Sequence, residues 1–188
     1  MKHIFLLSLI IFFSAGSFNN LNGQERHPLS AGTEIDVLPF ATGGYYLSAW
    51  GGAGNVRLRA VITKVYPPGF VMPDGMTNLK TDAFAVIADY FPWRGEQKQY
   101  SGLWLGAGIE YWMNNIEEKG TGITGEYNNL ILTAGTGYII PVYSGLYINP
   151  WAAIHFPVTG MADKMIGSTL IKQKKLMAEV SLKIGWQF

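Results

Sequence analysis

The chain has 188 residues, no cysteine, and 14 basic against 13 acidic side chains, which together make up only 14% of the sequence. Soluble domains carry about 25% charged residues, so this chain is unusually poor in charge. Its formal net charge of +1 argues against the basic surface that binds nucleic acid. The lack of cysteine excludes disulfide bonds and a lipidated amino-terminal cysteine.

The first clear pattern is an apolar run over residues 4–13, which follows Lys2 and precedes small and polar residues. This order is typical of a secretory signal peptide. The run is about half as long as the ~20 residues that a membrane-spanning helix needs, so we expect cleavage after Gly23 rather than an uncleaved anchor. The chain then divides into a signal peptide (1–23), an amino-terminal lead (24–31) and one further domain (32–188).

In residues 32–188 apolar side chains recur at every second position, as in strands with one apolar face. The expected strands cover residues 34–40, 43–50, 55–66, 79–91, 99–113, 127–140, 144–156 and 176–188. The first is short and contains Pro39, but it completes the even number of strands that single-chain bacterial barrels require. Pro150 cannot donate to a ladder, so we expect a bulge or a break near Asn149.

The connections between these strands alternate in length. Residues 51–54 and 141–143 are predicted tight turns, and residues 92–98 form a moderate one. At their opposite ends the strands are joined by a short link at 41–43 and by three long loops at 67–78, 114–126 and 157–173. Membrane barrels have short periplasmic turns and longer extracellular loops. We therefore expect the long loops on the outer side.

The closing stretch 180–188 alternates cleanly and ends on an aromatic residue. With the signal peptide and the rhythm of strands and loops, it makes residues 32–188 resemble the small eight-stranded outer-membrane β-barrel proteins of Gram-negative bacteria. The resemblance implies an all-β antiparallel transmembrane barrel in the lipid of the bacterial outer membrane, and we expect this barrel to be a monomer. It also implies that the barrel-insertion machinery reads an insertion signal made of Leu182, Ile184, Trp186 and Phe188.

Charged residues inside the strands share the parity opposite to the apolar face. On a lipid face, an arginine or lysine at mid-membrane would cost about 2–4 kcal/mol. We therefore predict a side-chain-filled lumen rather than a pore, held by a charge network. Its members are Arg57, Arg59 and Lys183 against Asp89, Glu110 and Glu179.

Catalytic and cofactor chemistry has weak support. His155 faces inward near the outer mouth, and small barrel enzymes that modify lipid A combine a histidine with a serine and an acidic residue, for which Ser168 and Asp163 are the candidates. A histidine bonded within the lumen is the simpler interpretation. Residues 120–125 match a dinucleotide fingerprint but neither follow a strand nor open a helix. No cofactor and no metal site is predicted.

Two ligand-binding alternatives stay open. The loop 67–78 is apolar for an exposed segment, so it binds a hydrophobic ligand or protein partner, or else folds over the barrel mouth. The whole chain could also be a soluble periplasmic barrel of lipocalin type. In that case the apolar face would point inward around a ligand.

Overall fold

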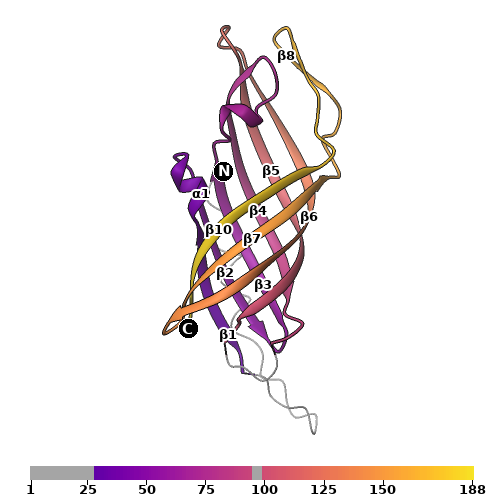
Figure 1. Ribbon diagram of the computed structural model, residues 1–188. Helices are drawn as coiled ribbons and strands as arrows, with labels where there is room; N and C mark the ends of the chain where they lie inside the picture. The colour runs from indigo at the N-terminus through magenta and orange to yellow at the C-terminus, as the bar shows by residue number, and fades with distance from the viewer. Residues whose placement is uncertain (1–27, 95–98) are drawn as a thin grey trace, which may run out of the picture.

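The computed structural model describes residues 28–94 and 99–188. In these residues eight strands close an antiparallel barrel in the order β1-β10-β7-β6-β5-β4-β3-β2 (Figure 1), which confirms the predicted fold. The wall consists of β1 (Ser30–Asp36), β2 (Tyr45–Ala53), β3 (Val56–Val65), β4 (Met76–Tyr90), β5 (Gly102–Glu118), β6 (Thr124–Tyr143), β7 (Leu146–Pro157) and β10 (Met177–Gln187). The predicted signal peptide (1–23) lies outside the described residues. The barrel begins at Ser30 rather than at residue 32.

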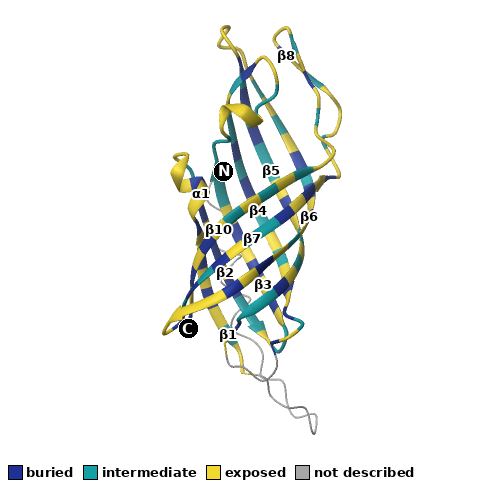
Figure 2. Cartoon of the chain, viewed as in Figure 1, coloured by how far each residue is buried: buried dark blue, intermediate teal, exposed yellow. Residues whose placement is uncertain are grey.

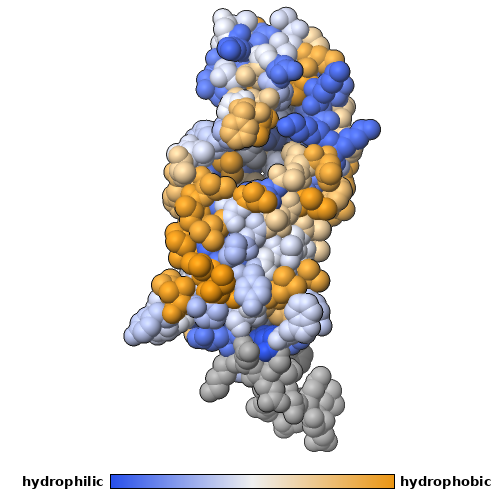
Figure 3. Space-filling model, viewed as in Figure 1, coloured by the Kyte–Doolittle hydropathy of each residue, from blue (hydrophilic) through white to orange (hydrophobic). Residues whose placement is uncertain are grey.

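Side chains alternate between the lumen and the exterior along every wall strand, as the banding in Figure 2 shows. On β3, Leu58 is 58% exposed whereas Arg57 and Arg59 are 0% and 2% exposed. Figure 3 shows apolar side chains gathered over the middle of the face in view. The apolar face therefore points outward. This excludes the lipocalin-type alternative, in which the apolar side chains would line the interior.

The wall has uneven height. β4, β5 and β6 have 15, 17 and 20 residues, whereas β1 and β2 have 7 and 9. The predicted long loop 114–126 is therefore wrong in extent, because β5 and β6 continue their pairing as far as Glu117 and Thr124. The turn between β6 and β7 lies at Ser144 and Gly145, both with positive φ, and not at 141–143.

The first strand ends earlier than predicted. β1 stops at Asp36, and residues 37–41 form a short helix, α1 (Val37–Ala41). The Asp36 carboxylate caps this helix by accepting a hydrogen bond from Leu38 N at 3.1 Å. Pro39 fits there because the first turn of a helix needs no donor from its backbone nitrogen. The prediction of a strand over residues 34–40 is therefore wrong for residues 37–40, which belong to α1.

Pro150 causes no bulge, contrary to prediction. It lies opposite Leu182 in an unshifted register between β7 and β10. Toward β6, pairing is recorded at Trp151 and again at Ile148, in the same register. The described β7 is continuous, and its ladder with β6 lacks pairs at Asn149 and Pro150. The register shift between β6 and β7 occurs instead between Pro141 and Tyr143.

Small elements stand at the end of the barrel that carries α1. They are the 3-10 turn η2 (Gly69–Val71) and a hairpin of β8 (Lys164–Ile166) and β9 (Thr169–Ile171). Glu118 anchors the hairpin, since its Oε1 accepts hydrogen bonds from the Ser168 and Thr169 hydroxyls at 2.8 Å each. Among the described residues no helix is long and apolar enough to cross a membrane.

Candidate functional site

The inner half of the lumen is filled by large aromatic side chains. The buried cluster contains Trp50, Phe91, Tyr100, Trp104, Ile139 and Tyr147. Polar atoms are paired across the barrel: Trp50 Nε1 donates to Tyr147 Oη at 2.9 Å, and Trp104 Nε1 donates to Asn149 Oδ1 at 2.9 Å. Gln187 closes the lower end, since it donates to Tyr100 O and accepts from Tyr100 N, each at 2.9 Å. We call this region the plug.

Two arginines and two carboxylates complete the plug. Arg57 lies 3.1 Å from Glu34 Oε1 and 2.8 Å from Asp89 Oδ2. Arg59 lies 3.4 Å from Glu34 Oε2 and 2.9 Å from Asp89 Oδ1. Each arginine therefore bridges both carboxylates, which is the pairing that a buried charge requires. β1, β3 and β4 supply these residues, so the plug ties three strands together.

Glu34 was not among the predicted network residues, although it lies at the centre of the plug. Besides both arginines, it accepts hydrogen bonds from Tyr147 Oη at 2.9 Å and Asn149 Nδ2 at 3.3 Å. The sequence signal was present but weak, because the short segment 34–40 offered too few alternations to assign its inward face.

Lys183 lies above the plug and makes a different contact from the one predicted. Its ammonium stands 3.7 Å from the centroid of the Trp151 ring and 5.2 Å from that of Tyr46. Such cation–π contacts stabilise a cation where water is scarce. With Arg57 and Arg59 it balances the three acidic residues of this level, namely Glu34, Asp36 and Asp89.

The outer half of the lumen is hollow. A cavity of about 660 Å³ opens toward the end of the barrel that carries α1 and η2. Its floor includes Arg59, Trp104 and Lys183. Its wall carries small inward side chains: Val61, Thr63, Ala83, Ala85, Gly135 and Ala153. We call this cavity the cup. The prediction of a lumen filled throughout is therefore wrong for the outer half.

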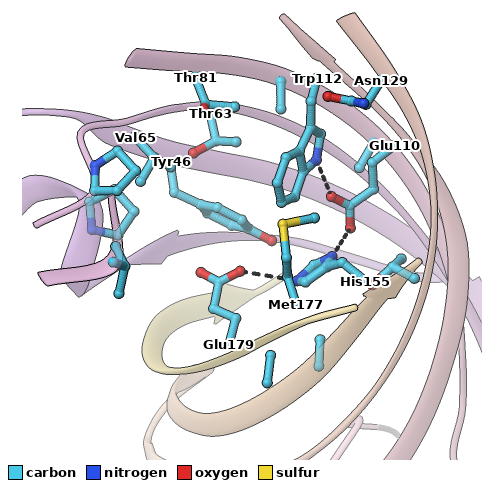
Figure 4. Close-up of a pocket in the computed structure, with 18 of the residues that line it drawn as sticks. Tyr46, Thr63, Val65, Thr81, Glu110, Trp112, Asn129, His155, Met177 and Glu179 are labelled. Atoms are coloured by element: carbon cyan, nitrogen blue, oxygen red, sulfur yellow. Dashed lines mark hydrogen bonds and ion pairs between the residues drawn. The ribbon is translucent and has the colours of Figure 1, made fainter. Parts of the chain in front are cut away.

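Three polar side chains form a row across the wall of the cup (Figure 4). His155 Nδ1 lies 3.5 Å from Glu110 Oε1, and His155 Nε2 lies 3.3 Å from Glu179 Oε2. Trp112 Nε1 donates to Glu110 Oε2 at 2.6 Å. Glu110 and Glu179 thus pair with His155 and not, as predicted, with the arginines. The row links β5, β7 and β10.

The structure does not assemble the candidate catalytic residues. Both ring nitrogens of His155 face carboxylates, whereas the Ser168 hydroxyl donates to Glu118 at the β8–β9 hairpin. Asp163 accepts from Gln173 N at 3.2 Å. Nucleophilic catalysis requires a serine and a base within hydrogen-bond reach. This geometry lends no support to a lipid A-modifying site.

The residues of the predicted insertion signal lie on the outer face of β10 and at its end. Leu182, Ile184, Trp186 and Phe188 are all exposed. Phe188 N donates to Ala31 O at 2.9 Å, beside the register pair of Gly32 and Gln187 that closes the barrel. Recognition of this stretch by the insertion machinery stays a prediction.

A closed barrel whose exposed face is apolar and whose charges are enclosed has the surface of a membrane-spanning structure, since a membrane barrel pairs its backbone by closure and turns apolar side chains to the lipid. The chain is an outer-membrane β-barrel protein in its fold and surface. The fold is similar to that of a major outer membrane protein from Thermus thermophilus, with a TM-score of 0.51, 11% identity, and coverage of 85% of this chain and 98% of that one.

Neisserial surface protein A aligns with a TM-score of 0.49 and 15% identity, over 85% of this chain and 94% of that one. No protein-family profile and no curated protein matches the sequence. At these identities the likeness to solved structures concerns the fold alone, so the function must be argued from the lumen itself.

Proposed function

We propose that the protein is a non-conducting barrel of the bacterial outer membrane that binds a small, largely apolar ligand in the cup. This is a recognition role performed by the outer half of the lumen together with the extracellular loops. The observation that carries the proposal is a cavity of about 660 Å³ that ends on a plug held by buried ion pairs.

The size and lining of the cup suit a ligand. Binding pockets for small molecules measure roughly 300–1,000 Å³ and combine apolar walls with a few polar groups. The cup follows this description, since Tyr46, Trp112 and Met177 face it together with the row of Glu110 and His155 (Figure 4). Protein interiors are otherwise close-packed, so a hollow of this volume is not a packing defect of the usual size.

The plug argues against transport of solutes through the barrel. An eight-stranded interior is just wide enough to be filled by side chains. Here Trp50, Trp104 and Tyr147 fill it, and four ion pairs fix the arginines beneath the cup. We expect no stable conductance when the folded protein is inserted in a planar bilayer.

Photo-crosslinking tests the binding role. The folded barrel in detergent is exposed to a fatty acid with a diazirine at the end of its tail, and labelled peptides are identified by mass spectrometry. We expect labels on inward residues such as Thr63 and Ala83. Ala85→Phe fills the cup and should abolish these labels. Ala88→Phe, on the outer face of the same strand, is the matched control and should keep them.

Two outcomes would count against the proposal. If inward residues of the wild-type barrel stay unlabelled, the cup does not bind apolar tails. If Ala85→Phe and Ala88→Phe label inward residues equally, the labels arise from somewhere other than the cup. Large stable conductance would contradict the sealed plug independently of either result.

A further inference from the structure

One side of the barrel wall is incomplete in its outer half. β1 pairs with β10 only from Gly32 opposite Gln187 to Asp36 opposite Lys183. β10 itself begins at Met177, six positions before Lys183, and it is paired with β7 from Met177 onward. Within the described part of the chain, residues 177–182 of β10 therefore form a free sheet edge, next to the short helix α1 instead of a strand.

The cup is open at this place. Figure 3 shows a hollow in the face of the molecule above β10, between α1 and η2, and Figure 1 shows the tall far wall behind it. Residues on both sides of the opening line the cavity, Leu38 and Thr42 from the α1 side and Met177 and Glu179 from the β10 side. The cavity thus has a lateral opening as well as an upper mouth.

The rim of this opening is apolar. Four exposed side chains from three separate segments line the cavity there: Leu38, Phe70, Val71 and Leu176. Contiguous exposed apolar surface marks a contact with lipid or a ligand. The rim also continues into the lipid-facing belt, because Val180 and Leu182 on the outer face of β10 are exposed beside it.

We propose that this opening is a lateral portal through which an acyl chain of a membrane lipid enters the cup. The proposal rests on the binding role proposed above and assigns the ligand to the hydrocarbon of the bilayer. An acyl chain fits the small, mostly apolar wall of the cup, where Val61, Ala83 and Ala153 leave space.

The free edge of β10 favours a lipid over a plain hydrocarbon. Unpaired backbone groups are costly at a membrane-facing edge unless a polar partner is present. The ester oxygens of a glycerolipid would accept hydrogen bonds from the free backbone N–H groups within residues 177–182 while the tail occupies the cup. The foot of the portal is fixed by Asp36, which accepts hydrogen bonds from Leu38 N, Ser181 Oγ and Trp151 Nε1.

A reversible staple at the foot of the portal, which ties α1 to β10 and prevents the two sides of the opening from separating, provides the test. Leu38 N and Ser181 Oγ bond to the same carboxylate oxygen of Asp36, which brings these residues next to each other. The chain has no cysteine of its own, so Leu38→Cys with Ser181→Cys adds a single pair that an oxidant closes and dithiothreitol opens. The protein is reconstituted in liposomes containing a phospholipid with a diazirine at its tail end.

In the reduced protein we expect the phospholipid to label inward residues such as Thr63 and Ala83, in addition to belt residues such as Leu58. Oxidation should abolish the inward labels and leave the belt labels. A diazirine fatty acid added from the aqueous side should still label the inward residues of the oxidised protein through the upper mouth. This second arm separates lipid that enters sideways from a free amphiphile that enters from above.

A second pair of variants keeps the test valid if the stapled protein fails to fold. Leu176→Asp places a charge on the portal rim, and Leu170→Asp is its matched control on the β8–β9 hairpin, at a position that does not line the cavity. We expect loss of inward phospholipid labels only in Leu176→Asp.

Inward labelling by phospholipid that survives both the closed staple and Leu176→Asp would overturn the portal. Labelling by the fatty acid but never by the phospholipid would also overturn it, yet leave the binding role intact. If neither probe labels the lumen, the portal and the proposed function fail together.

Discussion

The Ser181 hydroxyl donates a hydrogen bond to the Asp36 carboxylate at the level where β1 ends and the barrel wall opens. The same carboxylate caps α1 through Leu38 N and accepts from Trp151 Nε1 at 2.6 Å. One acidic side chain therefore joins the helix, β7 and β10 at the edge of the cup.

Removing the hydroxyl of Ser181 should weaken this junction modestly. A net hydrogen bond contributes about 1 kcal/mol, and up to about 3 kcal/mol when the acceptor is charged. We expect Ser181→Ala to lower the free energy of unfolding within this range, measured by urea titration in liposomes. Thr124→Ala, at the exposed outer end of β6, is a control away from the junction. An unchanged free energy of unfolding in Ser181→Ala would show that Asp36 holds β10 without the Ser181 hydroxyl.

Glu34 should be the most sensitive position of the plug. Its carboxylate faces both arginines, and removing one partner of a buried ion pair costs about 3–5 kcal/mol because the other charge is left uncompensated. We expect Glu34→Ala to lower the heat-modification temperature seen on gels and to reduce unfolding free energy accordingly. Glu126→Ala, on an exposed part of β6, should have little effect. Equal effects of the two substitutions would contradict the assigned network.

A charge on the belt should be costly, whereas the same charge beyond it should not. Leu105 and Leu170 are similarly exposed, at 52% and 49%, but Leu105 lies on β5 within the barrel wall and Leu170 on the outer hairpin. Leu105→Arg should cost folding free energy in a bilayer, up to the cost of about 2–4 kcal/mol at a mid-membrane position. Leu170→Arg should leave it nearly unchanged. If Leu105→Arg leaves the folding free energy unchanged, the outer face of β5 does not contact lipid.

The outer hairpin should detach without loss of the barrel when its anchor is removed. Glu118 accepts from Ser168 N at 2.9 Å as well as from the Ser168 and Thr169 hydroxyls. In Glu118→Ala we expect faster proteolysis between residues 158 and 176 and an unchanged heat-modified gel shift. Glu117→Ala removes the contact with Asn78 instead and serves as the control. Coincident loss of the barrel would show that the hairpin is part of the wall's folding unit.

The strand faces were predictable from sequence because a lipid belt imposes a strict alternation on each strand. The outward face of Leu58 and the inward face of Arg59 can be assigned from the alternation of β3 alone, without the strands that pair with it. The fold followed from the same signal, repeated along the chain. The charged residues Arg57, Arg59, Glu110 and Lys183, which were predicted to face inward, are buried.

The charge pairs and the cup were not predictable in this way, because they depend on register between strands distant in the chain. Glu34 meets Tyr147 and Asn149 of β7 only after β1 closes the barrel against β10. The hollow arises because large inward side chains such as Trp104 lie at one level and small ones such as Ala85 at another. Sorting inward residues by size along each strand would have revealed it.

Thiol accessibility distinguishes an outward-open cup above a sealed plug from an open pore and from a lumen that is filled throughout. Single-cysteine variants Ala83→Cys in the cup and Ile139→Cys in the plug are made in the cysteine-free chain. A membrane-impermeant maleimide is then added outside intact cells. We predict that Ala83→Cys reacts and that Ile139→Cys does not. Reaction at Ile139→Cys, or protection of Ala83→Cys in a barrel shown to be folded and surface-exposed, would contradict it.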